Sequence, residues 1–194
     1  FNNPTIRHFK KIEIDIQHHF LNQDYQFFIS EYSGHFLTLP KRAVEEGFTH
    51  FIAVGGDGTL NEIVNGLIEA FRTENGYDWE RISQIKIGIL PSGSGNDFIK
   101  NLGYTTIDEL QSLIAKDSSA LVDVGFAEFL IREKQKAERF FINVSDVGIG
   151  GEVVISKERL PLVFPGEVNY FIAIISTFLM YKKKIIKVTA KDFT

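Results

Sequence analysis

The sequence predicts an α/β protein: an open parallel sheet in its N-terminal part, followed by an incomplete β-rich, sandwich-like region. Three observations predict this fold class. Short apolar runs, typical of buried strands, alternate with helical segments up to about residue 120. Two of these runs lead directly into glycine-rich turns. Beyond that point, the chain is rich in β-branched and aromatic residues, which favour strands.

The first 50 residues predict a helix, a strand and a second helix. YQFFIS at 25–30 predicts the strand. The second helix is expected after Gly34 and ends at Gly47, because glycine often stands just after a helix. The first helix lies within residues 5–22, where apolar side chains recur every three or four positions and so share one helix face: Ile6, Phe9, Ile12, Ile16 and Phe20.

Two further strands flank the strongest helix signal in the chain. HFIAV at 50–54 and IKIGIL at 85–90 are continuous apolar runs, as in strands that are covered on both faces. A polar segment, 72–81, separates the helix from the second of these strands, and a short helix is expected to end at Leu102. Strands that alternate with helices predict a parallel sheet. The helix is marked by apolar residues at helical spacing: Leu60, Ile63, Val64, Leu67, Ile68 and Phe71.

The change in pattern predicts a domain boundary near residue 121. We expect residues 1–121 to form the α/β domain and residues 122–194 to form a β-rich domain that is truncated at its C-terminal end. The one helix expected in the second domain lies at about 167–181. The expected strands lie in VDVGFAEFLI (122–131), RFFINVSDVGIGGEVVI (139–155) and KKIIKVTAKDF (183–193).

Composition narrows the functional classes. The chain has 194 residues, with 21 basic against 25 acidic residues and a net charge of −4, so we expect no nucleic-acid partner. It contains no cysteine, which fits a reducing compartment and favours a cytoplasmic location. The longest apolar run, 168–181, is shorter than the roughly 20 residues that span a bilayer, so no transmembrane segment is expected.

The first glycine-rich turn, GGDGT at 55–59, has the pattern of a phosphate cradle. Glycines let backbone N–H groups approach a phosphate, and the N-terminus of the following helix adds partial positive charge. Asn61 stands where the dinucleotide fingerprint G-x-G-x-x-G needs glycine, so that motif is excluded. Asp57 has two interpretations that this motif supports equally: a carboxylate for phosphoryl transfer, or a cap of the helix.

The second turn, PSGSGNDF at 91–98, also follows a buried strand and opens a helix. Because the carboxyl ends of parallel strands share one sheet edge, we expect the two loops to lie side by side and to bind one phosphate ligand. The Ser94 hydroxyl can donate to phosphate, and Asn96 or Asp97 can cap the next helix. A G-x-S-x-G nucleophile elbow around Ser94 is excluded, because Ser92 and Asn96 flank it.

Four segments together resemble the diacylglycerol kinase catalytic-domain family, which includes bacterial lipid kinases and is related to sphingosine kinases. G-G-D-G-T alone also occurs in NAD kinases and phosphofructokinases, whereas its pairing with the second loop is more specific. The segments are SEYSGH (30–35), GGDGTLNEIVNGL (55–67), LPSGSGNDF (90–98) and FINVSDVGIGGEV (141–153).

The resemblance implies a set of site residues and cofactors. Asp57 is the implied catalytic carboxylate, with a metal, phosphate or proton role, and ATP and Mg²⁺ are the implied cofactors; no metal ligands are assigned. Ser30 and Ser94 stand where the family usually has threonines that contact the nucleotide. The implied ATP-binding residues are Ser30, Gly55, Gly56, Asp57, Gly58, Thr59, Leu60, Asn61, Gly93 and Ser94.

The implied function is ATP-dependent phosphorylation of a lipid hydroxyl, of diacylglycerol or a related lipid, at a membrane surface and within phospholipid metabolism. Two alternatives stay open: a kinase of a soluble acceptor such as NAD, and a nucleotide-binding regulator without turnover. The small glycine loop that usually follows the family's N-P turn is missing after Asn3 and Pro4. The acidic D-G-E-type segment that provides the family's general base would lie beyond Thr194, so we expect the 194-residue chain alone to be inactive.

Overall fold

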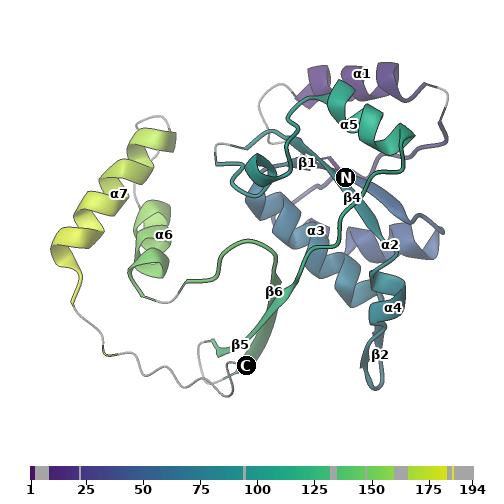
Figure 1. Cartoon of the computed structure of the whole chain (residues 1–194). Coiled ribbons are helices and arrows are strands. Elements are labelled where there is room, and N and C mark those ends of the chain that lie inside the picture. Colours follow the sequence, from purple (N-terminus) through teal and green to yellow (C-terminus); the bar gives the residue numbers. More distant parts are fainter. Residues whose placement is uncertain are drawn as a thin grey trace. The chain divides into compact units, whose positions relative to one another are not determined.

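The computed structural model describes residues 1–2, 9–21, 23–93, 95–131, 135–146, 148–159, 166–182 and 185. The chain divides into two compact units, Phe1–Asn143 and Val144–Thr194 (Figure 1). The first unit is a mixed α/β structure with a parallel sheet. The second unit contains helices α6 (Ile149–Arg159) and α7 (Gly166–Met180).

A parallel sheet lies at the centre of the first unit. Strands β1 (His50–Gly55) and β4 (Lys86–Pro91) pair in parallel, with Gly55 opposite Pro91. On the other side of β1, Asn2 forms parallel bridges to both Val54 and Ile29. The order across the sheet is therefore 28–30, 1–2, β1, β4. The strand predicted at 25–30 is present as an isolated bridge at Ile29 rather than as a full strand.

Helices cover both faces of this sheet. Figure 1 shows α1 and α5 together on one face and α2 and α3 together on the other. The helices predicted within 5–22, between Gly34 and Gly47, around 60–71 and before Leu102 are confirmed. The polar segment after the third of them forms the hairpin β2 (Arg72–Thr73) and β3 (Gly76–Tyr77). The helices of this unit are α1 (Phe9–His19), η1 (His35–Leu37), α2 (Leu39–Glu45), α3 (Asp57–Ala70), α4 (Trp79–Ile82), η2 (Ile99–Asn101) and α5 (Ile107–Ala115).

Helix α3 is the most deeply packed element. Five of the apolar residues that predicted it are buried within the helix: Leu60, Ile63, Val64, Leu67 and Ile68. Gly66 lets α3 approach its neighbours closely, because an added Cβ there would lie 2.5 Å from the carbonyl oxygen of Phe36 and 2.8 Å from Cγ of Pro40. This packing holds the N-terminus of α3 at the carboxyl end of β1.

Strands β5 (Gly125–Leu130) and β6 (Lys136–Phe141) form an antiparallel hairpin in which Phe126 lies opposite Phe140. The hairpin belongs to the first compact unit, because β6 packs against α3. The change in sequence pattern near residue 121 therefore precedes the β5–β6 hairpin, whereas the compact units divide after Asn143. The domain boundary at 121 stays a prediction.

The second unit differs from the predicted β-rich domain. Residues 149–155 were expected to continue a strand, but they lie in α6, where Val153 is buried. The Thr177 hydroxyl of α7 donates to the Ser156 hydroxyl of α6 over 2.8 Å, so helix pairing overrides the β-branched composition of this segment. Helix α7 confirms the helix predicted at 167–181. The strand predicted at 183–193 lies outside the described residues, apart from Ile185.

Candidate functional site

The two glycine-rich loops contact each other backbone to backbone. They follow β1 and β4, whose carboxyl ends are adjacent, and the Ser92 N–H donates to the Gly55 carbonyl over 3.0 Å. A Cβ added to Gly93 would lie 2.6 Å from Cα of Gly56, and one added to Gly56 would lie 3.0 Å from Cα of Gly93. The contact between the loops that the sequence predicted is therefore confirmed, and both glycines are needed for it.

The Asp57 carboxylate joins the first loop to the second. Its Oδ2 accepts a hydrogen bond from the Asp97 N–H over 3.1 Å, and its Oδ1 accepts one from the Phe98 N–H over 3.0 Å. Helix α3 begins after Gly56, which makes no side-chain cap hydrogen bond, so of the two interpretations of Asp57 the helix cap is wrong. Instead, the carboxylate accepts two backbone hydrogen bonds from the second loop, and such charge-assisted bonds are stronger than neutral ones.

The second loop is further fixed by Asn96. This residue has φ +53°, its Oδ1 accepts from the Gly93 N–H over 3.0 Å, and its Nδ2 donates to the Gly93 carbonyl over 2.6 Å. Asparagine tolerates this left-handed conformation because its short side chain bonds the local backbone. Asn96 therefore closes the loop and does not cap the next helix. Ser94, the predicted hydroxyl donor of this loop, lies outside the described residues.

A second carboxylate lies beside Asp57. A Cβ added to Gly95 would lie 3.2 Å from Oδ2 of Asp57 and 3.4 Å from Oδ2 of Asp97. The other oxygen of Asp97 accepts from Nζ of Lys100 over 2.6 Å. Asp97 was predicted only as a possible helix cap. Its place in the second glycine loop, beside the first loop with Asp57, was the sequence feature that could have predicted a pair of carboxylates.

The start of α3 presents an open surface. Gly58 is exposed, and an added Cβ there would meet nothing within 4 Å. The Thr59 side chain instead packs onto Gly55, where an added Cβ would lie 2.5 Å from Oγ1 of Thr59. Because the first turn of a helix leaves N–H groups without helical partners, this uncapped end has the geometry of an anion site. Leu60, predicted at the site, is buried in the core below it.

Asn61 and Asn65 connect α3 to β6. Asn61 donates from Nδ2 to the Phe140 carbonyl over 3.0 Å and accepts from Nε of Arg139 over 3.1 Å. Asn65 donates to the same carbonyl over 2.9 Å and accepts from the Phe140 N–H over 2.9 Å. The Asn65 amide thus bonds the Phe140 backbone in the way that a neighbouring strand would. The ATP contact predicted for Asn61 stays a prediction. In this structure, the side-chain amide of Asn61 holds β6.

We expect Asn65→Ala to lower the free energy of unfolding by about 1–3 kcal/mol, because the half-buried Phe140 N–H loses its acceptor, whereas the Phe140 carbonyl keeps Asn61 as a donor. Asn75→Ala, in the exposed turn between β2 and β3, is the control and should change it by less than about 0.5 kcal/mol. Chemical denaturation of both variants measures the difference. Equal, small effects for the two would show that the amide contributes nothing to holding β6.

Ser30 lies at the carboxyl ends of the strands, where the glycine loops also lie. Its side chain is largely buried, and its N–H donates to the Asn2 carbonyl over 3.1 Å. Residues 1–2 separate it from Gly55, a spacing of about 10 Å for two steps between strands. The Asn2 amide is fully buried and has no hydrogen-bond partner among the described residues. Sequence reasoning missed Asn2, and Asn3 and Pro4 lie outside the described residues.

The described residues contain no group of three or more histidine, aspartate or glutamate side chains that would hold a metal by themselves. Mg²⁺ commonly takes one or two protein carboxylates together with phosphate oxygens, and the pair Asp57 and Asp97 fits that donor set. None of the described helices combines the length and apolar character needed to cross a membrane.

Comparison with known proteins gives a family match that includes both glycine loops. A family model described as the diacylglycerol kinase catalytic domain matches residues 3–127. "Diacylglycerol kinase" of Staphylococcus carnosus (strain TM300) is 33% identical over 133 residues, which cover 68% of this chain and 37% of the relative. "Putative lipid kinase YtlR" of Bacillus subtilis (strain 168) is 26% identical over 203 residues, with coverage of 99% and 60%.

A third relative, "Diacylglycerol kinase" of Staphylococcus aureus (strain JH9), is 30% identical over 141 residues, which cover 72% of this chain and 38% of the relative. The chain thus spans between 37% and 60% of the length of these three relatives. The family match includes both glycine loops and the intervening helix α3.

Proposed function

Because the chain belongs to the diacylglycerol kinase catalytic domain family, we propose that the full-length protein transfers the γ-phosphoryl group of ATP to a lipid hydroxyl, with diacylglycerol or a related lipid as the acceptor. The observation that carries the proposal is the contact between the two glycine loops, which Asp57 holds together. The loops lie at the carboxyl ends of parallel strands, where open α/β sheets usually bind their ligands.

In this proposal, the phosphates of ATP lie against the uncapped start of α3. Gly58 leaves the space above the first turn open, and Gly56 and Gly93 keep the two loops in contact. Backbone N–H groups and the dipole of α3 then favour the negative charge. Ser30, at the same sheet edge, and Ser94 are the proposed hydroxyl contacts to the nucleotide. Residues 1–121 are the proposed ATP-binding domain.

The two carboxylates beside Gly95 make different contacts. Asp57 keeps both loops in register through two backbone hydrogen bonds, and Asp97 is paired with Lys100. Mg²⁺ bound to the phosphates would supply charge neutralisation, with Asp57 or Asp97 as its protein ligand. Phosphoryl transfer depends on such positioning and charge neutralisation more than on covalent catalysis, so a rigid loop pair suits it.

A panel of acceptors tests the proposal. The full-length protein is incubated with radiolabelled ATP and Mg²⁺ in three reactions, with mixed micelles of diacylglycerol, with NAD, or without an acceptor. We expect label in the organic extract of the first reaction alone, and none when a chelator removes Mg²⁺. Label on NAD would identify a soluble-acceptor kinase. ATP binding without transfer to any acceptor would identify a regulator, and either result would replace the proposed lipid kinase.

A further inference from the structure

Two asparagines of this chain precede a glycine: Asn65–Gly66 in α3, and Asn75–Gly76 at the turn between β2 and β3. Asparagine is thermally labile, because the next backbone nitrogen along the chain can attack its side-chain amide. Glycine at the next position leaves that nitrogen unobstructed, since it has no side chain. The attack also needs a peptide bond that can rotate and a side-chain amide that can move, so the surroundings of each pair decide whether it reacts.

Asn75 lies in an exposed turn at the tip of a short hairpin. The ladder of this hairpin consists of two residue pairs, Arg72–Tyr77 and Thr73–Gly76, and a ladder this short opens easily. Among the described residues, none makes a hydrogen bond to the Asn75 side-chain amide. A Cβ added to Gly76 would meet nothing within 4 Å, so the space beside the attacking nitrogen is open.

The Asn65 amide, by contrast, is held by hydrogen bonds. Its Nδ2 donates to the carbonyls of Asn61 and Phe140 over 2.8 Å and 2.9 Å, and its Oδ1 accepts from the Phe140 N–H over 2.9 Å. Gly66 lies inside α3, where each backbone N–H is bonded to the carbonyl four residues before it. Attack on the Asn65 side chain would require these bonds to break first.

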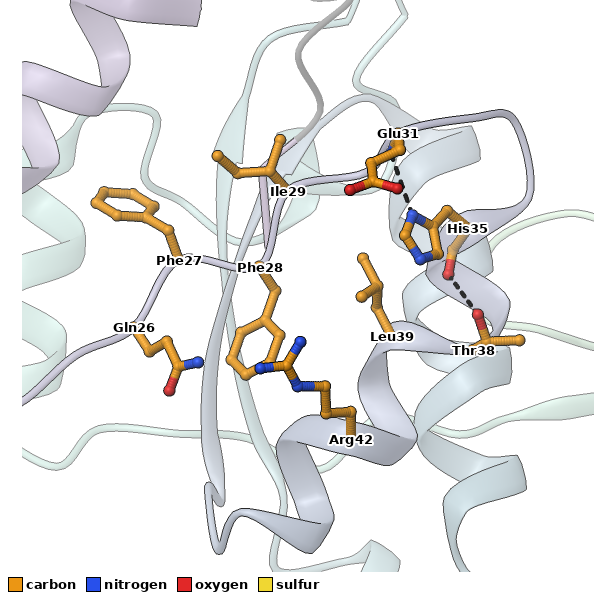
Figure 2. Close-up of a pocket in the computed structure, with 9 residues that line it drawn as sticks. All are labelled: Gln26, Phe27, Phe28, Ile29, Glu31, His35, Thr38, Leu39 and Arg42. Carbon is orange, nitrogen blue, oxygen red and sulfur yellow. Dashed lines mark hydrogen bonds between the residues drawn. The ribbon is translucent and has the colours of Figure 1, made fainter.

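The Gly66 backbone is also closely packed. A Cβ added there would lie 2.5 Å from the Phe36 carbonyl oxygen, so α3 lies directly against the η1–α2 segment. Figure 2 shows two hydrogen bonds that fix this segment: Nδ1 of His35 accepts from the Glu31 N–H over 3.1 Å, and the His35 carbonyl accepts from the Thr38 hydroxyl over 3.1 Å. The peptide bond before Gly66 therefore cannot rotate without local unfolding of α3.

We propose that Asn75 is a site of spontaneous deamidation in the folded protein and that Asn65 is not. The Gly76 nitrogen loses its proton to a base in solution and forms a bond to Cγ of Asn75. The Cγ–Nδ2 bond breaks, and the amide nitrogen takes a proton from water and leaves as ammonia. Water then adds to either carbonyl of the resulting succinimide and breaks the bond from that carbonyl to the ring nitrogen, which leaves aspartate or isoaspartate.

The modification changes the hairpin as well as its charge. Either product places a carboxylate next to Glu74, and isoaspartate also adds a methylene to the main chain of the turn. The Thr73 hydroxyl spans this turn, because it accepts from the Asn75 N–H over 3.3 Å and donates to the Gly76 carbonyl over 3.2 Å, and a longer turn breaks that geometry. We expect trypsin to cut the native isoaspartate form after Arg72 at least about threefold faster, because cleavage follows local opening.

Peptide mapping by mass spectrometry tests the proposal on the full-length protein. The folded protein is incubated at mildly alkaline pH and then digested with trypsin, which releases residues 73–81 with Asn75 and residues 43–72 with Asn65. We expect deamidation at Asn75 to be at least about 10²-fold faster than at Asn65, because several hydrogen bonds must break before Asn65 reacts. Chromatography of the first peptide should show isoaspartate, which marks the succinimide route.

The same protein unfolded in guanidinium chloride is the control that removes the structure and keeps both Asn–Gly pairs. In that sample, we expect the rates at Asn65 and Asn75 to agree within about threefold, because the unfolded chain holds neither amide in place. Asn75→Gln is the matched variant. Its longer side chain disfavours ring closure, so residues 73–81 should stay unmodified over the same time.

Two outcomes would overturn the proposal. One is equal rates at Asn65 and Asn75 in the folded protein, and the other is an Asn75 that reacts in guanidinium chloride but stays unmodified in the folded protein. Unchanged trypsin cleavage after Arg72 in the isoaspartate form would overturn the effect on the hairpin. None of these readouts involves ATP or phosphoryl transfer, so failure here is distinct from failure of the proposed function.

Discussion

Asp57→Asn is expected to lower kcat/KM for phosphoryl transfer by the full-length protein at least about 10²-fold, while the protein stays folded. The carboxylate accepts from the N–H groups of both Asp97 and Phe98. An amide of the same size keeps one acceptor oxygen and turns a donor toward the other N–H group. The second loop then loses its register with α3, and one of the two proposed magnesium ligands loses its charge.

The matched control for Asp57→Asn is Asp78→Asn. Asp78 also stands at a helix start and accepts a backbone hydrogen bond, from the Arg81 N–H over 3.1 Å, but it caps α4 away from the loops. Because asparagine caps helices as well as aspartate does, this variant should keep its activity and its stability. Steady-state kinetics with thermal unfolding compare the two variants. Near-normal turnover of Asp57→Asn at saturating Mg²⁺ would show that the carboxylate is structural only.

Gly93→Val and Gly58→Val are each expected to weaken ATP binding at least about tenfold, but for different reasons. At Gly93, a Cβ would lie 2.6 Å from Cα of Gly56, so the two loops must separate even without a ligand. We therefore expect Gly93→Val also to lose about 1–3 kcal/mol of stability. At Gly58, a Cβ meets no protein atom within 4 Å, so the fold should tolerate valine and only the space proposed for phosphate is filled.

Calorimetric titration with ATP and chemical denaturation of the same samples separate these effects. Gly151→Val in α6 is the matched control for Gly58→Val, because Gly151 is also helical and a Cβ there meets nothing within 4 Å. Its ATP affinity should equal that of the unmodified protein. Undiminished affinity in Gly93→Val would restrict the nucleotide site to the first loop, and undiminished affinity in Gly58→Val would place the phosphates away from the start of α3.

The sequence by itself determined the elements whose signals are local. The helical spacing of the apolar residues in α3 and the continuous apolar runs of β1 and β4 depend on neighbours along the chain, and the structure has all three elements. The two glycine-rich turns after those strands were also enough to predict that the loops meet, because parallel strands end at one edge of a sheet.

Only the tertiary structure decided which groups meet across long stretches of chain. Asp57 bonds the backbone of residues 40 and 41 positions away, and Asn65 bonds the backbone of Phe140. Backbone N–H and C=O groups are the same at nearly every residue, so no sequence pattern marks them as partners. Residues 149–155 have strand-like composition but form a helix, because packing against α7 outweighs weak local preference.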